Sequence, residues 1–205
     1  MNTGDLLLRA VLCDPGDDTV RLAFADYQEE NGRGLHARFV RDQIAGVVRM
    51  VPLSMLVPLE PLTGVMSHQT TRHATARGCV VTCDRVELVF GRGFVDEVRL
   101  PAAAFTEDFA RKLFARHPVT RVVLTDREPT TWLHGGWTWI STATRWQVNN
   151  RNRRAFLRPE LMEHLPAPGP CATAEAANAA LSDACVAWGR SLAGLPPLPH
   201  ASGGA

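Results

Sequence analysis

Two histidines and two cysteines that lie close together in the chain have the side chains that bind zinc. They are His68, His73, Cys79 and Cys83. Protein zinc sites use cysteine sulfur and histidine nitrogen in a tetrahedral arrangement. However, Cys79 and Cys83 fall in sequence typical of a strand, where residues four apart lie about 13 Å from each other, too far for one ion. The sequence therefore favours buried free cysteines and a solvent-facing loop, with zinc as the alternative and no other cofactor expected.

A second candidate site combines arginines with tryptophans. Between Glu128 and Glu160 there is no acidic residue, so five arginines give this segment a local charge of +5. Arginine neutralises phosphate and indole rings stack on bases, which are the contacts that single-stranded nucleic acid needs. Alternatively, tryptophans at alternate strand positions fill a core and arginines cover its rim. The residues concerned are Arg145, Arg151, Arg153, Arg154, Arg158, Trp137, Trp139 and Trp146.

The first 31 residues are acidic, with seven carboxylates against two arginines and a local charge of −5. A carboxylate cluster can bind a divalent cation or transfer protons. However, Asp14, Asp17 and Asp18 stand where turns and helix N-termini favour acids, and their spacing matches no calcium loop. We therefore interpret them as structural. The acidic segment could also be the intramolecular partner of the basic one.

The chain contains no phosphate loop, dinucleotide fingerprint, nucleophile elbow or metalloprotease helix, so the sequence leans away from an enzyme without excluding one. Its 205 residues, 45% hydrophobic and 21% charged, are typical of a globular protein. A net charge of +1 gives no overall attraction to nucleic acid or membrane. Five scattered cysteines, an acidic N-terminus and the lack of a long apolar run predict a cytoplasmic protein with free thiols and no membrane partner.

Residues 1–51 are predicted to form three short helices, at about 4–13, 17–31 and 35–50. Thr3 or Asp5 is suited to cap the first helix, and Asp17 or Asp18 to begin the second. Asn31-Gly32 is suited to end the second helix, because both residues tolerate the left-handed conformation. Helices this short are marginal alone, so they must pack on one another or on the rest of the chain.

Several motifs of this segment resemble the bacterial repeat-companion domain family. They are Asp5-Leu6-Leu7, Asp14-Pro15-Gly16-Asp17-Asp18, Arg21-Leu22-Ala23-Phe24-Ala25-Asp26-Tyr27-Gln28-Glu29-Glu30-Asn31-Gly32 and Ala37-Arg38-Phe39-Val40-Arg41-Asp42-Gln43. The family is a short helical module often found ahead of leucine-rich or other repeats. This chain departs from it at Tyr27, Gln28 and Asp42, where the family usually has Trp, Leu and an apolar residue. Because the family has no established activity, the resemblance, over residues 5–43, implies architecture rather than chemistry.

The rest of the chain is predicted to comprise a linker or long loop at 52–78, an α/β domain at 79–194 and a disordered tail at 195–205. Gly91-Arg92-Gly93 indicates a hairpin turn. Val98-Arg99-Leu100 and Val122-Val123-Leu124 recur at a spacing of 24 residues around a predicted helix, which resembles the start of a leucine-rich repeat array. The alternative is an ordinary βαβ unit. A Trp-rich hairpin and a helix at about 173–193 complete this domain.

We therefore expect an α+β or α/β fold with a three-helix N-terminal module. The leading functional hypothesis is a non-catalytic protein-interaction or scaffold protein with an unknown protein partner. The alternative is a protein that binds single-stranded nucleic acid through the arginines and tryptophans of residues 132–158.

Overall fold

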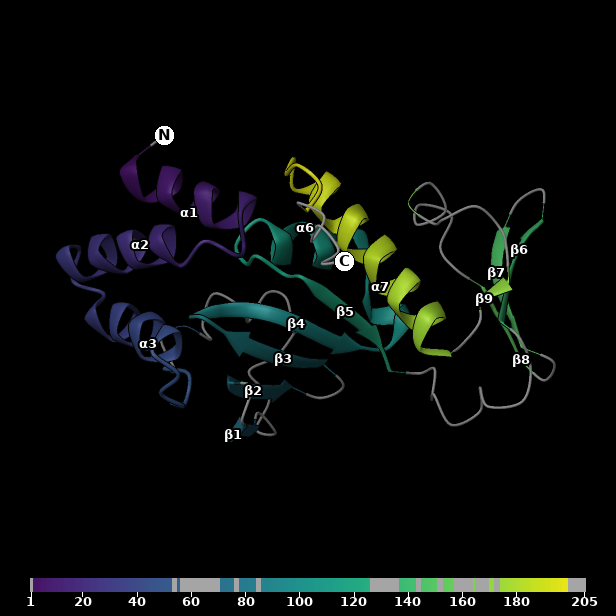
Figure 1. Cartoon of the computed structure of the whole chain (residues 1–205), viewed down its shortest axis with the longest axis horizontal. Helices are drawn as coiled ribbons and strands as arrows, with labels where there is room; N and C mark the ends of the chain where they lie inside the picture. The colour runs from purple at the N-terminus through teal and green to yellow at the C-terminus, as the bar shows by residue number, and fades with distance from the viewer. Residues whose placement is uncertain are drawn as a thin grey trace, which may run out of the picture.

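The computed structural model describes residues 2–52, 55, 71–75, 78–83, 86–125, 137–142, 145–150, 153–156, 164, 170–171 and 174–198. These residues form a mixed α+β fold, as expected. Three N-terminal helices lie at one end of a five-stranded sheet, two further helices cover that sheet, and a second sheet lies at the opposite end (Figure 1).

The N-terminal helices are α1 (Thr3–Cys13), α2 (Asp18–Glu30) and α3 (Gly34–Ile44). Asn2 caps α1 by accepting from the Asp5 amide at 2.8 Å, and Asp17 caps α2 by accepting from the Thr19 amide at 2.8 Å. Helix α3 ends six residues before the predicted Met50. The reason is Gly46, whose φ of 74° closes the helix in the left-handed conformation that glycine adopts freely.

The main sheet has the order β1-β2-β3-β4-β5. Its strands are β1 (Thr71–Thr75), β2 (Gly78–Cys83), β3 (Val86–Gly91), β4 (Phe94–Leu100) and β5 (Arg121–Leu124). Residues 71–75, predicted to lie in a linker, form β1 instead. These residues lack the alternation of hydrophobic and polar side chains that is typical of a strand. They are extended because their backbone pairs with β2. Alternate residues of β2, β3 and β4, such as Val81 and Leu88, pack in the core with residues of the covering helices.

The βαβ unit predicted from the 24-residue spacing is present. Strands β4 and β5 pair in parallel, with Val98 opposite Val122 and Leu100 opposite Leu124. Between them lie a short 3₁₀ turn, Ala102–Ala104, and helix α6 (Glu107–Phe114). The Thr106 hydroxyl caps α6 by accepting from the Phe109 amide at 3.2 Å.

Helix α7 (Ala174–Leu192) covers the outer side of β5. The Val122 amide donates to the Ser182 hydroxyl at 3.0 Å. In a longer array of parallel strands, an amide on this side of β5 would pair with the next strand. In the described part of the chain, the parallel pairing therefore stops at β5, with a helix side chain in place of another strand.

The buried Arg190 joins α7 to the helical module. Its side chain is 1% exposed and donates to the carbonyls of Leu12 at 3.1 Å, Cys13 at 3.4 Å and Pro196 at 2.7 Å. Leu195 is buried beside it, so the predicted disordered tail begins as ordered chain over residues 195–198. The remaining predicted tail, 199–205, lies outside the described residues.

Replacing Arg190 by methionine should lower the free energy of unfolding by about 2 kcal/mol, because buried carbonyls lose a charged donor. Urea denaturation measures this loss. The matched control is Arg9→Met, since Arg9 also donates to backbone carbonyls, those of Ala193 and Gly194, but at an exposed position. A loss for Arg190→Met no larger than that for Arg9→Met would contradict the structural role of Arg190.

The second sheet has the order β8-β7-β6-β9. Its strands are β6 (Trp137–Thr142), β7 (Arg145–Asn150), β8 (Arg153–Phe156) and β9 (Pro170–Cys171). The antiparallel pair β6–β7 is the predicted Trp-rich hairpin. No helix within the described segments has both the length and the apolar character needed to cross a bilayer.

Candidate binding groove

The turn between β3 and β4 docks on the N-terminal helices. Gly93 has a φ of 88°, and a Cβ atom at this position would lie 2.3 Å from Cγ2 and 2.8 Å from Cα of Val40 in α3. The absence of a side chain at Gly93 therefore lets the turn approach the helix backbone. The next residue, Phe94, is 2% exposed and packs with Val11, Phe24 and Val40 in the core of the helical module.

Two polar side chains hold this turn in place. The Arg21 guanidinium, 2% exposed, donates to the carbonyls of Arg92 at 3.0 Å and Pro15 at 2.8 Å, and lies 5.3 Å from the centre of the Phe94 ring. Burial lowers the pKa of Arg21 to about 10, so it remains charged at neutral pH. The Gln43 amide donates to the Phe90 carbonyl at 3.3 Å. The helices and the hairpin are thus joined by specific hydrogen bonds.

A groove of about 1010 Å³ opens where the helical module, the hairpin and the end of α6 meet. Its lining includes aromatic residues of α2 and β4, two histidines, and polar residues of α1 and the α2–α3 turn. Several lining residues are exposed, among them Asp5, Arg33 and Leu35, so the groove is open to solvent. Its volume lies at the upper end of what small-molecule pockets occupy.

Aromatic rings form the floor of the groove. The Phe24 ring lies 5.5 Å from the Phe94 ring and 5.7 Å from the His36 ring, between ring centres. Phe94 also contacts His36 at 6.0 Å and His117 at 6.3 Å. These spacings are those of tilted and edge-to-face aromatic pairs. The two phenylalanine rings are buried, 5% and 2% exposed, so the partly exposed His36 and His117 rings are the part of the floor that faces the groove.

Both histidines of the floor are neutral at neutral pH. Burial, reinforced by the positive charge of Arg33, lowers the pKa of His36 to about 4. Burial, His36 and Arg116 lower the pKa of His117 to about 3. The Val95 amide donates to Nδ1 of His117 at 3.3 Å, which leaves the ring proton on Nε2. The imidazoles thus act as aromatic surface with polar edges rather than as cations.

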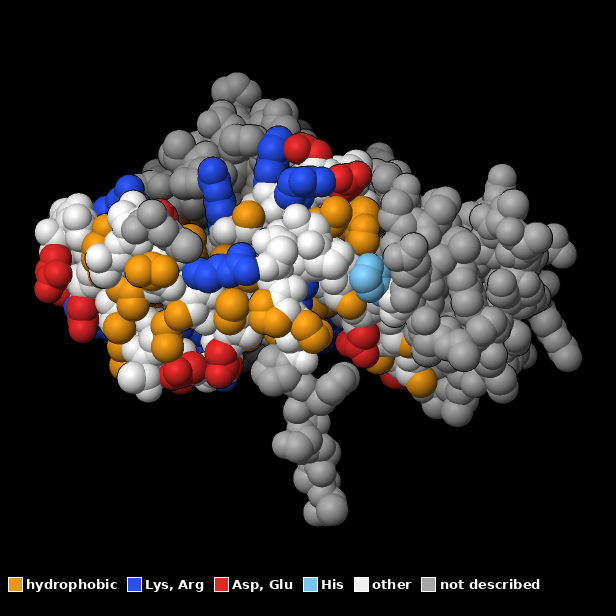
Figure 2. All heavy atoms as spheres, turned by 90° about the horizontal axis from the view of Figure 1, so that it is seen from above, with side chains coloured by type: hydrophobic (Ala, Val, Ile, Leu, Met, Phe, Trp, Pro, Cys, Tyr) orange, Lys and Arg blue, Asp and Glu red, His pale blue; other side chains and the backbone are white. Residues whose placement is uncertain are grey.

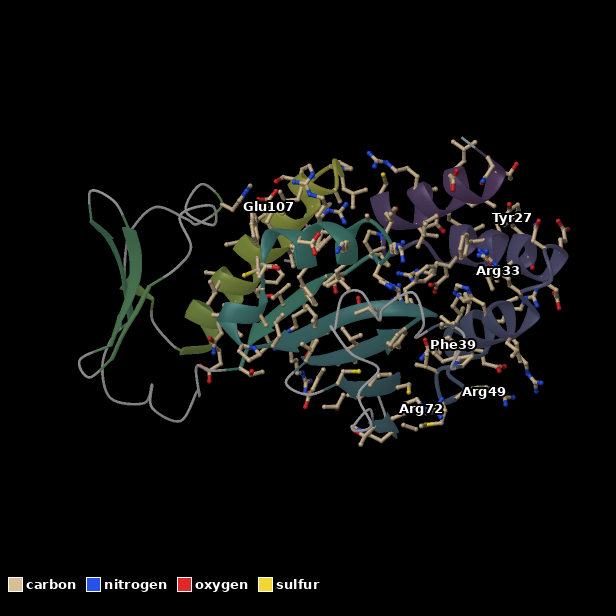
Figure 3. The ribbon with its side chains drawn as sticks, turned by 180° about the vertical axis from the view of Figure 1, so that it is seen from behind. Tyr27, Arg33, Phe39, Arg49, Arg72 and Glu107 are labelled. Atoms are coloured by element: carbon tan, nitrogen blue, oxygen red, sulfur yellow. The ribbon has the colours of Figure 1, made fainter. Side chains whose placement is uncertain are left out.

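The rim of the groove carries exposed apolar and charged groups. Leu35, at the start of α3, is 67% exposed. The neighbouring Arg33 donates to the neutral side-chain oxygen of Gln28 at 3.4 Å. Figure 3 shows Tyr27 and Arg33 on the helical module, on the side reached by the hairpin end of the sheet. The rim therefore combines a large apolar side chain with a cation.

The structure does not bring the predicted zinc ligands together. In the β1–β2 pair, His73 lies opposite Val80 and so shares its face of the sheet, whereas Cys79 lies on the other face. Cys79 and Cys83 are buried in the core, and His73 is exposed. His68 lies outside the described residues. Among the residues that the structure describes, no group of three or more His, Cys, Asp or Glu side chains could hold a metal ion.

Six residues of the predicted arginine and tryptophan site lie on strands β6, β7 and β8. The pairing register puts Trp137, Trp139 and Trp146 at positions of one face of this sheet, and Arg145 and Arg154 at positions of the other. Arg153 falls at a position on the face of the tryptophans. Arg151 and Arg158 lie outside the described residues.

The acidic residues of the N-terminal segment have structural partners. Asp14 accepts from the Gly16 amide at 3.0 Å, and Asp17 caps α2. Asp26 and Glu29 both pair with Arg41, at 2.7 and 2.6 Å. These contacts agree with the interpretation of the carboxylates as turn, cap and ion-pair residues.

No sequence motif marks the groove. Neither His36 nor His117 belongs to a recognisable sequence motif. The Gly91-Arg92-Gly93 motif predicts the hairpin turn, but no local pattern predicts that this turn packs against α3. A comparison with protein-family models, with curated proteins and with solved structures found no match for this chain.

Proposed function

We propose that this chain is a non-catalytic protein-interaction module whose groove binds a short segment of a partner protein. The observation that carries the proposal is the groove itself, in which the partly exposed His36 and His117 rings lie near the exposed Leu35. Aromatic anchoring surfaces with an apolar residue at the rim are typical of peptide-binding sites. Figure 2 shows further hydrophobic side chains spread over the helical end of the molecule.

The proposal includes the scaffold role, the cytoplasmic location and the repeat-companion resemblance that the sequence suggests. A scaffold protein of the cytoplasm, with an N-terminal module of the repeat-companion type, is compatible with this function. The supporting observations are the three helices at residues 3–44, of which α1 and α2 have side-chain caps, and the parallel β4–α6–β5 unit that follows them. The groove lies where the two meet.

Selection of peptides tests this proposal. A random 12-residue peptide library would be selected on the full chain, and the dissociation constants of the enriched peptides measured by fluorescence anisotropy. Leu35→Asp should weaken binding about tenfold or more, because a charge replaces an apolar contact at the groove. Leu6→Asp is the matched control, since Leu6 of α1 is 55% exposed and does not line the groove. No enriched peptide, or equal losses in both variants, would overturn the proposal.

A second candidate function, binding of single-stranded nucleic acid, is supported by the register that puts three tryptophans at positions of one sheet face. Labelled single-stranded DNA and RNA would be titrated with the wild-type chain and with an Arg151/Arg153/Arg154→Ala variant at low and moderate salt. Salt-sensitive binding that the variant loses would favour this function, because each phosphate contact steepens the salt dependence. Absence of binding at low salt would remove it.

A further inference from the structure

Charge is unevenly distributed around the groove. Arg33 lies on its rim, and within the described residues it forms no ion pair. Its described hydrogen bond goes to the neutral amide oxygen of Gln28, at 3.4 Å. A guanidinium can donate two parallel hydrogen bonds to a carboxylate, and Gln28 offers a single oxygen. Arg33 therefore retains donors that a ligand in the groove can use.

Among the described lining residues Asp5 is the one acidic side chain. The Asp5 carboxylate accepts from the Asn2 amide at 3.3 Å as part of the α1 cap. Asp26 and Glu29 of α2 are paired with Arg41 of α3. Arg33 and Arg116 also exert a positive field on the two histidines of the floor. The described lining thus holds two arginines, Arg33 and Arg116, against the one carboxylate of Asp5, a net charge of +1, which complements an anion next to an apolar group.

We propose that the segment bound in the groove is acidic, with an Asp or Glu side chain next to a bulky apolar residue. The carboxylate pairs with Arg33, and the apolar side chain lies between the partly exposed His36 ring and the exposed Leu35. Helix α3 begins directly after Arg33 without a side-chain cap, so its positive end adds to the attraction. This inference rests on the proposed function, because it specifies the chemistry of the same groove.

The neutral histidines fit this arrangement. A charged imidazole on the floor would oppose burial of an apolar side chain, whereas a neutral ring provides aromatic contact area. The exposure of Arg33 leaves it free to turn toward a ligand without unfolding any element. An aromatic or leucine side chain beside the acidic residue would fill the floor and hold the carboxylate within reach of the rim.

The test uses the peptides enriched on the wild-type chain, synthesised with acetylated and amidated ends so that their carboxylates are side chains. We expect an Asp or Glu next to Leu, Ile, Phe, Tyr or Trp in the enriched peptides. Arg33→Glu should weaken their binding at least tenfold, and Arg33→Lys by less, because lysine keeps the charge but loses the fork. The matched control is Arg38→Glu, because Arg38 is an exposed arginine of α3 that does not line the groove.

A charge exchange completes the experiment. Peptides whose acidic residue is replaced by Lys should bind the wild type at least tenfold more weakly and regain affinity for Arg33→Glu. Two outcomes would overturn the acidic-segment inference and leave the proposed function standing. In the first, the enriched peptides depend on Leu35 but carry no acidic residue. In the second, they bind Arg33→Glu as tightly as the wild type. Peptides insensitive to Leu35→Asp would instead overturn the proposed function.

Discussion

Replacing Gly93 by alanine is expected to lower the free energy of unfolding by about 4 kcal/mol. About 1 kcal/mol comes from placing a Cβ on a residue with a positive φ, and the rest from overpacking. The new methyl group would meet the side chain and the Cα atom of Val40 at less than 3 Å, and a helix backbone cannot rotate out of the way as a side chain can. Urea denaturation followed by circular dichroism measures the loss.

Gly32→Ala is the matched control for this prediction. Gly32 has a φ of 77°, close to that of Gly93, but a Cβ at Gly32 would meet no atom within 4 Å. Its substitution should therefore cost the conformational part alone, about 1 kcal/mol. Equal losses for the two variants would show that the hairpin turn does not pack against α3 as described.

The second large effect is a loss of stability in mild acid, of about 4 kcal/mol between pH 7.5 and pH 5. His36 and His117 have pKa values of about 4 and about 3 in the folded chain, against an ordinary value of 6.5. As the pH falls below 6.5, the unfolded chain takes up protons on these histidines that the folded chain does not bind. Unfolding is therefore favoured, and the contribution of the neutral histidines is complete only above about pH 6.5.

Urea denaturation at several pH values between 7.5 and 5 measures this dependence. In a His36→Gln/His117→Asn variant the loss over this range should shrink to less than about 1 kcal/mol, because the proton uptake on unfolding has been removed. Asparagine at position 117 keeps an acceptor for the Val95 amide. His73→Gln, at an exposed position of β1, should retain the wild-type dependence. An unchanged slope in the double variant would refute the assignment.

Local chemistry predicted much of the fold. Asp17 caps α2 as expected from a carboxylate before a helical segment, and Gly194 ends α7 with a φ of 62°. The 24-residue spacing anticipated the pairing of Val98 with Val122. In each case a few neighbouring residues or a short repeat carries the signal, so the pattern is visible without knowledge of the tertiary structure.

The groove could not be predicted in the same way. Phe24, His36, Phe94 and His117 come together because Gly93 lets the hairpin turn approach α3, and such long-range packing leaves no periodic pattern in a single sequence. Strand β1 was missed for a related reason, since its polar residues are held by backbone pairing with β2. Cys79 and Cys83 are buried free cysteines, the arrangement that the sequence favours, and the two faces of the strand pair separate His73 from Cys79, which excludes the alternative of a zinc site shared by these two residues.

The contact of Ser182 with the Val122 amide has a consequence for self-association. An uncovered strand at the border of a sheet is a template on which another molecule can add a strand, and this is a common start of aggregation. Here a helix lies along that border, and its hydroxyl accepts from an amide that a foreign strand would need. Detachment of α7 would thus expose the unpaired edge of β5. Conditions that detach this helix should therefore promote aggregation before the rest of the chain unfolds.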